Sequence, residues 1–334
     1  MKRLLLLIAV VGLSASVYAQ KAKKTKKAKV PVKGTWTKTI DLYGGLTQVG
    51  NNNWYSTGSD KFTMSLMGQL NATAGYSWKN KTWGTGLYAA YGLLNTTHTG
   101  VTKLNDRFEI GTRLLINPKQ WNKKWAWGPR AALRTQFSNG YFYNYMGDEN
   151  VNRRRSGFFA PAIITVSPIG LYHKPCKAFE VYASPLTARW IVVTNQPYSY
   201  MAQGGVYKGV VEDPLARLYN VSPTKEHRGE FGLYARFAAN FNIMKNISYS
   251  GRAEIFGNYL TAYKDALPGR FANMDIFMVN QVKMKVNKLI DVRYNLDVMY
   301  DDDMKQPGNA VLAPRRSVGL QMLSTLGVGV SFNR

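Results

Sequence analysis

The sequence contains little of what usually builds a disulfide, metal or catalytic centre. Its 334 residues include one cysteine, Cys176, so no disulfide can form within the chain. The three histidines, His98, His173 and His227, lie far apart, and nothing close to them indicates a nucleophile paired with a base. We therefore predict a protein that is not an enzyme and that needs no cofactor.

Long hydrophobic runs are also absent after the first residues, which argues against a membrane-spanning helix in the rest of the chain. The exception is the apolar run 4–13, which follows Lys2 and Arg3 and precedes small residues ending at Ala19. This run is too short to span a bilayer, and its surroundings are those of a secretory signal peptide. We predict Sec-type export, with residues 1–19 as the signal peptide.

Acidic residues are scarce: 19 Asp and Glu stand against 44 Lys and Arg, a formal net charge of +25. Residues 20–35 are rich in lysine, and we predict that they form a disordered periplasmic tail. The tail is either simply solvated or a tether to anionic lipid, cell-wall polymer or a protein. A nucleic-acid binder could be this basic, but the predicted export and the absence of a basic helix argue against it. Anionic lipid headgroups or an anionic solute fit the predicted location better.

From residue 36 onward the chain is dominated by alternation with a period of two residues. Between Phe62 and Trp78 every second residue is mostly apolar, and the residues between them are polar or small. Between Ile290 and Asp301 the alternating partners are mostly charged. A soluble β-sandwich would turn the apolar face inward, whereas a membrane barrel turns it toward lipid and keeps the charges inside. Alternation alone does not separate these folds.

Strand length and the spacing of the connections favour the membrane barrel. We predict twelve strands over residues 38–47, 59–78, 82–95, 104–117, 125–137, 157–173, 177–194, 229–243, 247–262, 273–286, 289–301 and 317–332. Short and long connections alternate, as in barrels with short periplasmic turns and long outer loops, and the longest, 195–228, could contain a further hairpin. The predicted fold of residues 36–334 is an all-β, antiparallel transmembrane β-barrel of about twelve strands with both termini periplasmic.

Aromatic residues gather near the predicted strand ends, as in the interfacial girdles of a barrel. The tryptophans concerned are Trp78, Trp83, Trp121, Trp125 and Trp127. Ordinary enrichment of aromatics in β-sheets is the alternative explanation. The last strand places Phe332 near the C-terminus and is similar to the final strand that barrel-insertion machinery recognises, so that machinery is an expected partner.

Several short pieces follow one another along nearly the whole chain. They are Asn53-Trp54 before Gly58, Asn105-Asp106-Arg107, Arg134-Thr135-Gln136-Phe137 before Gly140-Tyr141, Phe159-Ala160-Pro161, Ala183-Ser184-Pro185-Leu186 and Tyr300-Asp301-Asp302-Asp303. This ordered set resembles a family of Bacteroidota outer-membrane β-barrels known only as a domain of unknown function. Ala160-Pro161 departs from the Ser-Pro of that family. The resemblance implies an outer-membrane barrel and implies no activity.

The polar faces of the predicted strands carry charged residues that a barrel would turn toward its lumen. These are Arg107, Glu109, Arg113, Arg130, Arg134, Arg236, Arg252, Glu254, Lys283, Lys285, Asp291, Arg293 and Asp297. Basic residues outnumber acidic ones in this set, which would favour the passage or binding of anions. The alternative is a network of ion pairs that fills a narrow lumen. The sequence does not separate a pathway from a plug.

Two charged runs fall in predicted outer loops. Arg153, Arg154 and Arg155 could contact lipopolysaccharide phosphates or could be ordinary exposed loop charge. Asp301, Asp302 and Asp303 could bind Ca²⁺ through their carboxylates, but a solvated acidic turn is the interpretation we favour, so we predict no metal site.

Together these features predict a protein of the Gram-negative outer membrane that acts as a narrow channel or solute-binding conduit with anion preference. The alternative is a non-conducting barrel that serves as a scaffold or accessory of an envelope or secretion complex. Expected contacts are outer-membrane lipid and lipopolysaccharide, with an envelope protein partner in the second case. The residues name no substrate.

Overall fold

In the computed structural model all described residues lie in the unit Gly34–Arg334. The structure describes residues 34–50, 62–96, 100–143, 152–194, 205–207, 210–212, 215–222, 224–260, 274–305 and 317–333. The predicted signal peptide, and the predicted tail up to residue 33, lie outside the described residues.

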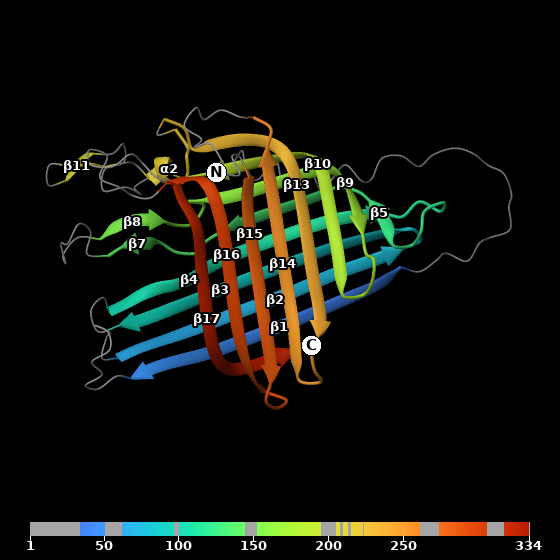
Figure 1. The fold of residues 1–334 in the computed structure, drawn as a ribbon, viewed down its shortest axis with the longest axis horizontal. Helices are drawn as coiled ribbons and strands as arrows, with labels where there is room; N and C mark the ends of the chain where they lie inside the picture. Colours follow the sequence, from blue (N-terminus) through green and yellow to red (C-terminus); the bar gives the residue numbers. More distant parts are fainter. Residues whose placement is uncertain are drawn as a thin grey trace. The chain divides into compact units, whose positions relative to one another are not determined.

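The wall of this unit is made of antiparallel strands, most of them long (Figure 1). They are β1 Thr35–Gly50, β2 Phe62–Trp78, β3 Lys81–Thr96, β4 Gly100–Ile116, β5 Trp125–Trp127, β6 Arg130–Thr135, β9 Ala162–His173, β10 Phe179–Val192, β13 His227–Asn242, β14 Ile247–Asn258, β15 Met274–Lys285, β16 Ile290–Lys305 and β17 Ser317–Asn333. Twelve wall positions result when β5 and β6, which both lie between β4 and β9, are counted together.

The strands close into a ring. From β10 the neighbours run β13, β14, β15, β16, β17, β1, β2, β3 and β4. β4 pairs with β5 and β6, both of these pair with β9, and β9 pairs with β10, where the order began. The predicted all-β, antiparallel, twelve-stranded barrel is therefore confirmed. The predicted strands coincide with observed ones apart from their ends and an interruption in the strand predicted at 125–137.

The two ends of the barrel differ in their connections. At the end that we call the turn end, residues 79–80, 243–246 and 286–289 connect neighbouring strands. At the opposite loop end, β7 Gly140–Phe142 pairs with β8 Arg153–Ser156, β11 Gly205–Tyr207 pairs with β12 Val210–Glu212, and the short helix α2 spans Leu215–Leu218. No helix among the described residues is long and apolar enough to cross a membrane.

These loop-end elements refine the sequence prediction. The further hairpin expected within 195–228 is present as β11 and β12. The predicted loop 138–156 also contains a hairpin, β7 and β8, which corrects the prediction. Its strands are held partly by side chains, since the guanidinium carbon of Arg154 lies 5.9 Å from the ring centroid of Tyr141.

The predicted strand 125–137 is broken at Gly128 and Pro129, which is a second correction. Pro129 has no N–H to donate, and Gly128 has a φ of 154°, which side chains rarely adopt. A Cβ on Gly128 would lie 1.9 Å from the carbonyl oxygen of Leu114. The backbones of β4 and this segment therefore approach closely, and the Tyr182 hydroxyl donates to the Gly128 carbonyl at 3.1 Å.

The barrel is apolar outside and charged inside, the reverse of a soluble sheet protein. On the outer face Leu42 is 48% exposed, Leu66 54% and Leu326 56%, whereas inside the barrel Asp291 and Arg293 are only 1% and 2% exposed. A soluble protein rarely exposes so continuous an apolar surface. The alternation that the sequence left ambiguous thus has the orientation of a membrane barrel.

Aromatic side chains cluster on the outside near the turn end. The ring centroids of Trp36 and Tyr76 are 4.9 Å apart, those of Trp36 and Trp83 are 5.9 Å apart, and Tyr76 stacks on Trp78 at 5.3 Å. Amphipathic rings at one level are typical of the interface between lipid and water.

Candidate lumen site

Charged side chains inside the barrel form three clusters, of which the first lies near the turn end. This turn-side cluster consists of Asp41, Lys283, Asp291 and Arg293 from β1, β15 and β16. Arg293 Nη2 lies 2.9 Å from Asp41 Oδ1 and 3.2 Å from Asp291 Oδ2, and Lys283 Nζ lies 3.1 Å from Asp291 Oδ2. The ring of Tyr43 covers the Arg293 guanidinium at 4.2 Å. The cluster is charge-balanced and ties three wall strands together.

The central cluster contains six arginines and four carboxylates from six strands. Its members are Arg107, Glu109, Arg113, Arg130, Arg134, Glu180, Arg236, Arg252, Glu254 and Asp297. Arg107 Nη1 lies 2.5 Å from Asp297 Oδ2, and Arg252 Nη2 lies 2.5 Å from Glu109 Oε2. Several wall strands separate β4 from β14 and β16 in either direction around the ring, so these ion pairs cross the lumen.

Glu180 and Glu254, like Glu109, each contact more than one arginine. Arg113 donates from both terminal nitrogens to the two oxygens of Glu180, each at 3.2 Å, which is the bidentate geometry that favours arginine. Glu180 also accepts from Arg236 at 2.8 Å and from the Tyr172 hydroxyl at 2.9 Å. Glu254 is shared more loosely, at 3.4 to 3.7 Å, by Arg130, Arg236 and Arg252.

Arg134 differs from the other arginines of the central cluster. Among the described residues, no carboxylate oxygen lies within 4.0 Å of its guanidinium, which lies 3.9 Å from the ring centroid of Phe277. The guanidinium groups of Arg107 and Arg252 approach the same ring at 5.6 and 5.7 Å. The surplus of positive charge is therefore concentrated around Phe277.

The third cluster lies near the loop end and is almost fully buried. In this loop-side cluster Arg189 forms ion pairs with Glu230 and Asp275, and Arg228 Nη2 lies 2.7 Å from Glu230 Oε1. The guanidinium carbon of Arg189 lies 4.0 Å from the ring centroid of Phe256. The cluster joins β10, β13 and β15, and the Asp301 carboxylate of β16 also interacts electrostatically with Arg189 and Asp275.

A cavity of about 570 Å³ extends inside the barrel from the central cluster toward the turn end. The central-cluster residues Arg113, Arg130 and Arg134 line one part of it. Neutral hydrogen-bonding side chains line the rest, among them Thr37, Asn71, Thr73, Thr82, Asn240 and Ser250. The volume is that of a small-ligand site, and guanidinium groups beside hydroxyls and amides suit a small oxyanion.

Most predicted lumen residues lie in these clusters. Twelve of the thirteen belong to the turn-side or central cluster. Lys285 lies at the turn end of β15 and is exposed, beyond the ion pairs of the turn-side cluster.

The two charged runs lie in strands. Arg153, Arg154 and Arg155 belong to β8, where the Arg155 carbonyl accepts a hydrogen bond from the Tyr219 hydroxyl at 2.8 Å. Burial raises the pKa of the Tyr219 phenol to about 12.

The acidic run corrects the sequence prediction of a turn, because β16 continues through Lys305 and β17 pairs with it from Ser317. Asp301 lies opposite Gly319 in this ladder. Among the described residues, no group of three or more His, Cys, Asp or Glu side chains is arranged to hold a metal ion.

The sequence analysis overlooked several inward charges, among them Asp41, Glu180, Arg189, Arg228, Glu230 and Asp275. Asp41 could have been found, because Ile40 and Leu42 on either side of it point outward. Arg189 and Glu180 could not both be assigned by alternation, since nine positions separate them. The register shifts between Ser184 and Thr187, and this bulge turns both side chains inward.

Two of the sequence pieces that carried the family resemblance meet at the loop end. The Asp106 carboxylate accepts from the backbone N–H groups of Phe137 and Ser138 at 2.6 and 2.9 Å and from Lys103 Nζ at 3.0 Å. Lys103 Nζ also donates to Gln136 Oε1 at 2.9 Å. These residues therefore fix the end of β6 against β4 and have a structural role.

A third piece forms the bulge in β10. The buried Ser184 hydroxyl donates to the Ile169 carbonyl at 2.6 Å and lies 2.9 Å from the Leu186 carbonyl. Beyond the bulge, the hydroxyls of Ser167 in β9 and Thr187 in β10 lie 2.7 Å apart. The segment Ala183-Ser184-Pro185-Leu186 thus has a structural role, because it forms the bulge that shifts the register of β10.

Comparison with known sequences identifies one family. The family described as "Protein of unknown function (DUF3078)" matches residues 46–141, which include the pieces around Asp106 and Gln136. No curated protein matches the chain.

Comparison with solved structures finds outer-membrane barrels. An outer membrane channel from Pseudomonas putida F1 has 8% identity and a TM-score of 0.37, with 94% of this chain and 100% of that chain covered. The translocator domain of the autotransporter NalP from Neisseria meningitidis has 8% identity and a TM-score of 0.37, with 89% and 87% covered. The NanC porin has 11% identity and a TM-score of 0.35, with 88% and 98% covered. The chain is similar to these three proteins at low identity.

Proposed function

We propose that this barrel resides in the outer membrane and acts as a narrow conduit that binds and passes small anionic solutes. The observation that carries the proposal is Arg134, which lines the cavity of about 570 Å³ and has no carboxylate within 4.0 Å among the described residues. An arginine without a carboxylate in direct contact in a low-dielectric site favours an anion beside it.

The membrane location is supported by the outer surface. Leu66 and Leu326 are more than half exposed, and aromatic rings border this apolar surface near the turn end. In water such a surface would drive association, whereas lipid satisfies it. We place the turn end in the periplasm, because short turns lie there in barrels of this kind.

The central cluster would select by charge and limit the size of the solute. Its six arginines exceed its four carboxylates, so a cation entering the cavity meets a net positive potential, and an anion is attracted. The loosest arginine contacts are those to Glu254, including Arg130 at 3.7 Å. A bound anion could therefore be held by Arg134 and Arg130 together without displacing the tight pairs.

The test is solute flux into vesicles that contain the purified, folded protein. Small sulfonates or carboxylates should enter faster than neutral solutes of the same size, and ammonium analogues should enter slowest. Arg134→Gln should reduce the preference for anions. Lys285→Gln removes the same charge from the exposed turn end and should leave the preference nearly unchanged. Equal flux of all three solute classes would contradict the proposed selectivity.

A second candidate is a closed barrel that serves as a scaffold for an envelope complex. The observation that favours it is the pair of cross-lumen contacts, Arg107 with Asp297 and Arg252 with Glu109, each at 2.5 Å. Such buried, well-formed pairs fill the lumen and resist opening. A folded protein that passes no solute at all would place this candidate first.

A further inference from the structure

The barrel wall is incompletely paired where β1 meets β17. These strands share six residue pairs, from Asp41 opposite Asn333 to Leu46 opposite Val328, whereas β1 and β2 share sixteen. Among the described residues, β17 has no β1 partner between Ser317 and Gly327. Figure 1 shows the two strands diverging from their paired ends, β17 in red and β1 in blue.

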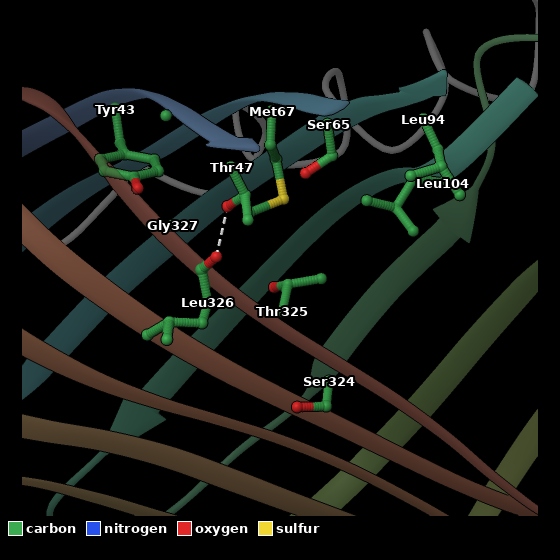
Figure 2. Close-up of a pocket in the computed structure, with 11 residues that line it drawn as sticks. Tyr43, Thr47, Ser65, Met67, Leu94, Leu104, Ser324, Thr325, Leu326 and Gly327 are labelled. Atoms are coloured by element: carbon green, nitrogen blue, oxygen red, sulfur yellow. Dashed lines mark hydrogen bonds between the residues drawn. The ribbon is translucent and has the colours of Figure 1, made fainter. Parts of the chain in front are cut away.

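A pocket of about 200 Å³ lies where the two strands part (Figure 2). Its β17 lining includes Ser324 and Leu326, which belong to the outer face, and Thr325 and Gly327, which belong to the inner face. A pocket lined by both faces of one strand must pass along the edge of that strand. Residues of both faces of β17 therefore border the pocket where β1 provides no ladder partner.

The interior part of the pocket is mainly apolar. Met67 of β2, Leu94 of β3 and Leu104 of β4 line it from within the barrel. These side chains lie apart from the charged clusters. Without an apolar occupant, their apolar surface in the pocket would be exposed to water, which is unfavourable. The volume is smaller than that of a typical drug-sized site, so a chain segment fits better than a whole small molecule.

The backbone edge at the pocket is partly satisfied. The Thr47 hydroxyl donates to the Leu326 carbonyl, the contact marked by the dashed line in Figure 2. Thr47 thus replaces the ladder partner that β17 lacks at this position. An unpaired carbonyl in contact with lipid would cost several kcal/mol, on the order expected for a buried polar group. This contact makes the edge compatible with an apolar occupant.

We propose that the gap between β1 and β17 is a lateral opening in which the acyl chain of a membrane lipid inserts, reaching Met67, Leu94 and Leu104. This inference rests on the membrane location proposed above, and it is independent of anion conduction. The occupant is argued from continuity: the pocket opens beside Leu326 on the exposed apolar face, and apolar side chains continue from there into the barrel.

The test is labelling by a phospholipid that carries a photoreactive diazirine on its acyl chain, in vesicles that contain the full-length folded protein. Mass spectrometry then locates the labelled residues. A closed wall would restrict labels to outward residues such as Leu66, whereas the lateral opening predicts labels on the inward residues Met67, Leu94 and Leu104 as well.

Matched variants of β2 separate pocket occupancy from general effects. Met67→Trp fills the pocket from the inside and should abolish labelling of Leu94 and Leu104 while Leu66 stays labelled. Met64→Trp places the same bulk on the outward face and should preserve labelling of both leucines. Leu94→Trp, with Leu104 as the reporter, provides a second filling variant if Met67→Trp does not fold.

The outcomes are distinct for the two proposals. Labels on outward residues alone overturn the lateral opening, leave the membrane location intact and point to a partner strand as the occupant beside Thr325 and Leu326 of β17. Labels on neither face mean that the barrel is not in lipid, which overturns the membrane location and the lateral opening together.

Discussion

Arg252 of β14 reaches across the barrel lumen to Glu109 of β4, with 2.5 Å between guanidinium Nη2 and carboxylate Oε2. The two side chains are mostly buried, and Glu109 also lies 3.5 Å from Arg107 Nε. Removing one partner of such a pair leaves an uncompensated buried charge, which is more costly than the pair itself is stabilising.

This contact predicts a strong, non-additive effect of mutation. Glu109→Gln or Arg252→Gln should each lower the free energy of unfolding by about 3–5 kcal/mol. The double variant should lose less than the sum of the two, because neither charge is then left alone. Urea unfolding in detergent, monitored by tryptophan fluorescence, measures the free energy of unfolding of the wild type, the two single variants and the double variant. Additive losses would mean that the two charges are not coupled.

The close approach of Gly128 to β4 gives a second prediction. Gly128→Ala should strongly destabilise the barrel, because the added Cβ would lie 1.9 Å from the Leu114 carbonyl oxygen at a φ of 154°. Gly86→Ala is the matched control, since nothing lies within 4 Å of a Cβ placed there. The measurement is the temperature at which the folded gel band converts to the unfolded band. A similar temperature for both variants would contradict the close approach.

The fold could be predicted from the sequence because apolar residues that face lipid alternate with polar residues that face the lumen along each strand of a membrane barrel. Ile40 and Leu42 outside and Asp41 inside illustrate how one local pattern assigns both faces of a strand. Alternation alone does not reveal where a bulge exchanges the inward-facing and outward-facing positions of a strand. The bulge after Ser184 shifts the pattern, so Glu180 and Arg189 were overlooked. The break at Gly128 interrupts the strand without changing which residues face inward.

The candidate site was less accessible to sequence reasoning. Inward charge could be predicted, but pairing across the lumen depends on the stagger of the whole ring and joins residues such as Arg107 and Asp297, which are distant in the chain. The incomplete pairing of β1 with β17 likewise has no local signal, because both segments have the alternation of ordinary strands.

Subcellular fractionation tests the membrane location. The full-length chain should sediment with the outer membrane and resist extraction by carbonate or high salt. It should also migrate differently on gels with and without heating, because a barrel with satisfied backbone pairs withstands detergent. Recovery from the soluble periplasm would contradict the location.

The buried phenol of Tyr219 predicts a pH effect at the loop end. Burial raises its pKa from 10 to about 12, so its contribution to stability is complete below pH 10 and is lost as the pH rises through about 12. Tyr219→Phe should remove the hydrogen bond to the Arg155 carbonyl at a cost of about 1 kcal/mol. The difference in phenolate absorbance between wild type and Tyr219→Phe should show a midpoint near 12.

A midpoint near 10, the typical value for tyrosine, would mean that the Tyr219 phenol is not buried.

The most direct test of the proposed conduit is the reversal potential of the purified protein in a planar bilayer under a potassium chloride gradient. The surplus of arginine in the central cluster predicts a reversal potential displaced from zero toward the equilibrium potential of chloride. Arg134→Gln combined with Arg130→Gln should move the reversal potential toward zero without preventing insertion. A cation-selective potential, or no conductance from folded protein, would contradict the account.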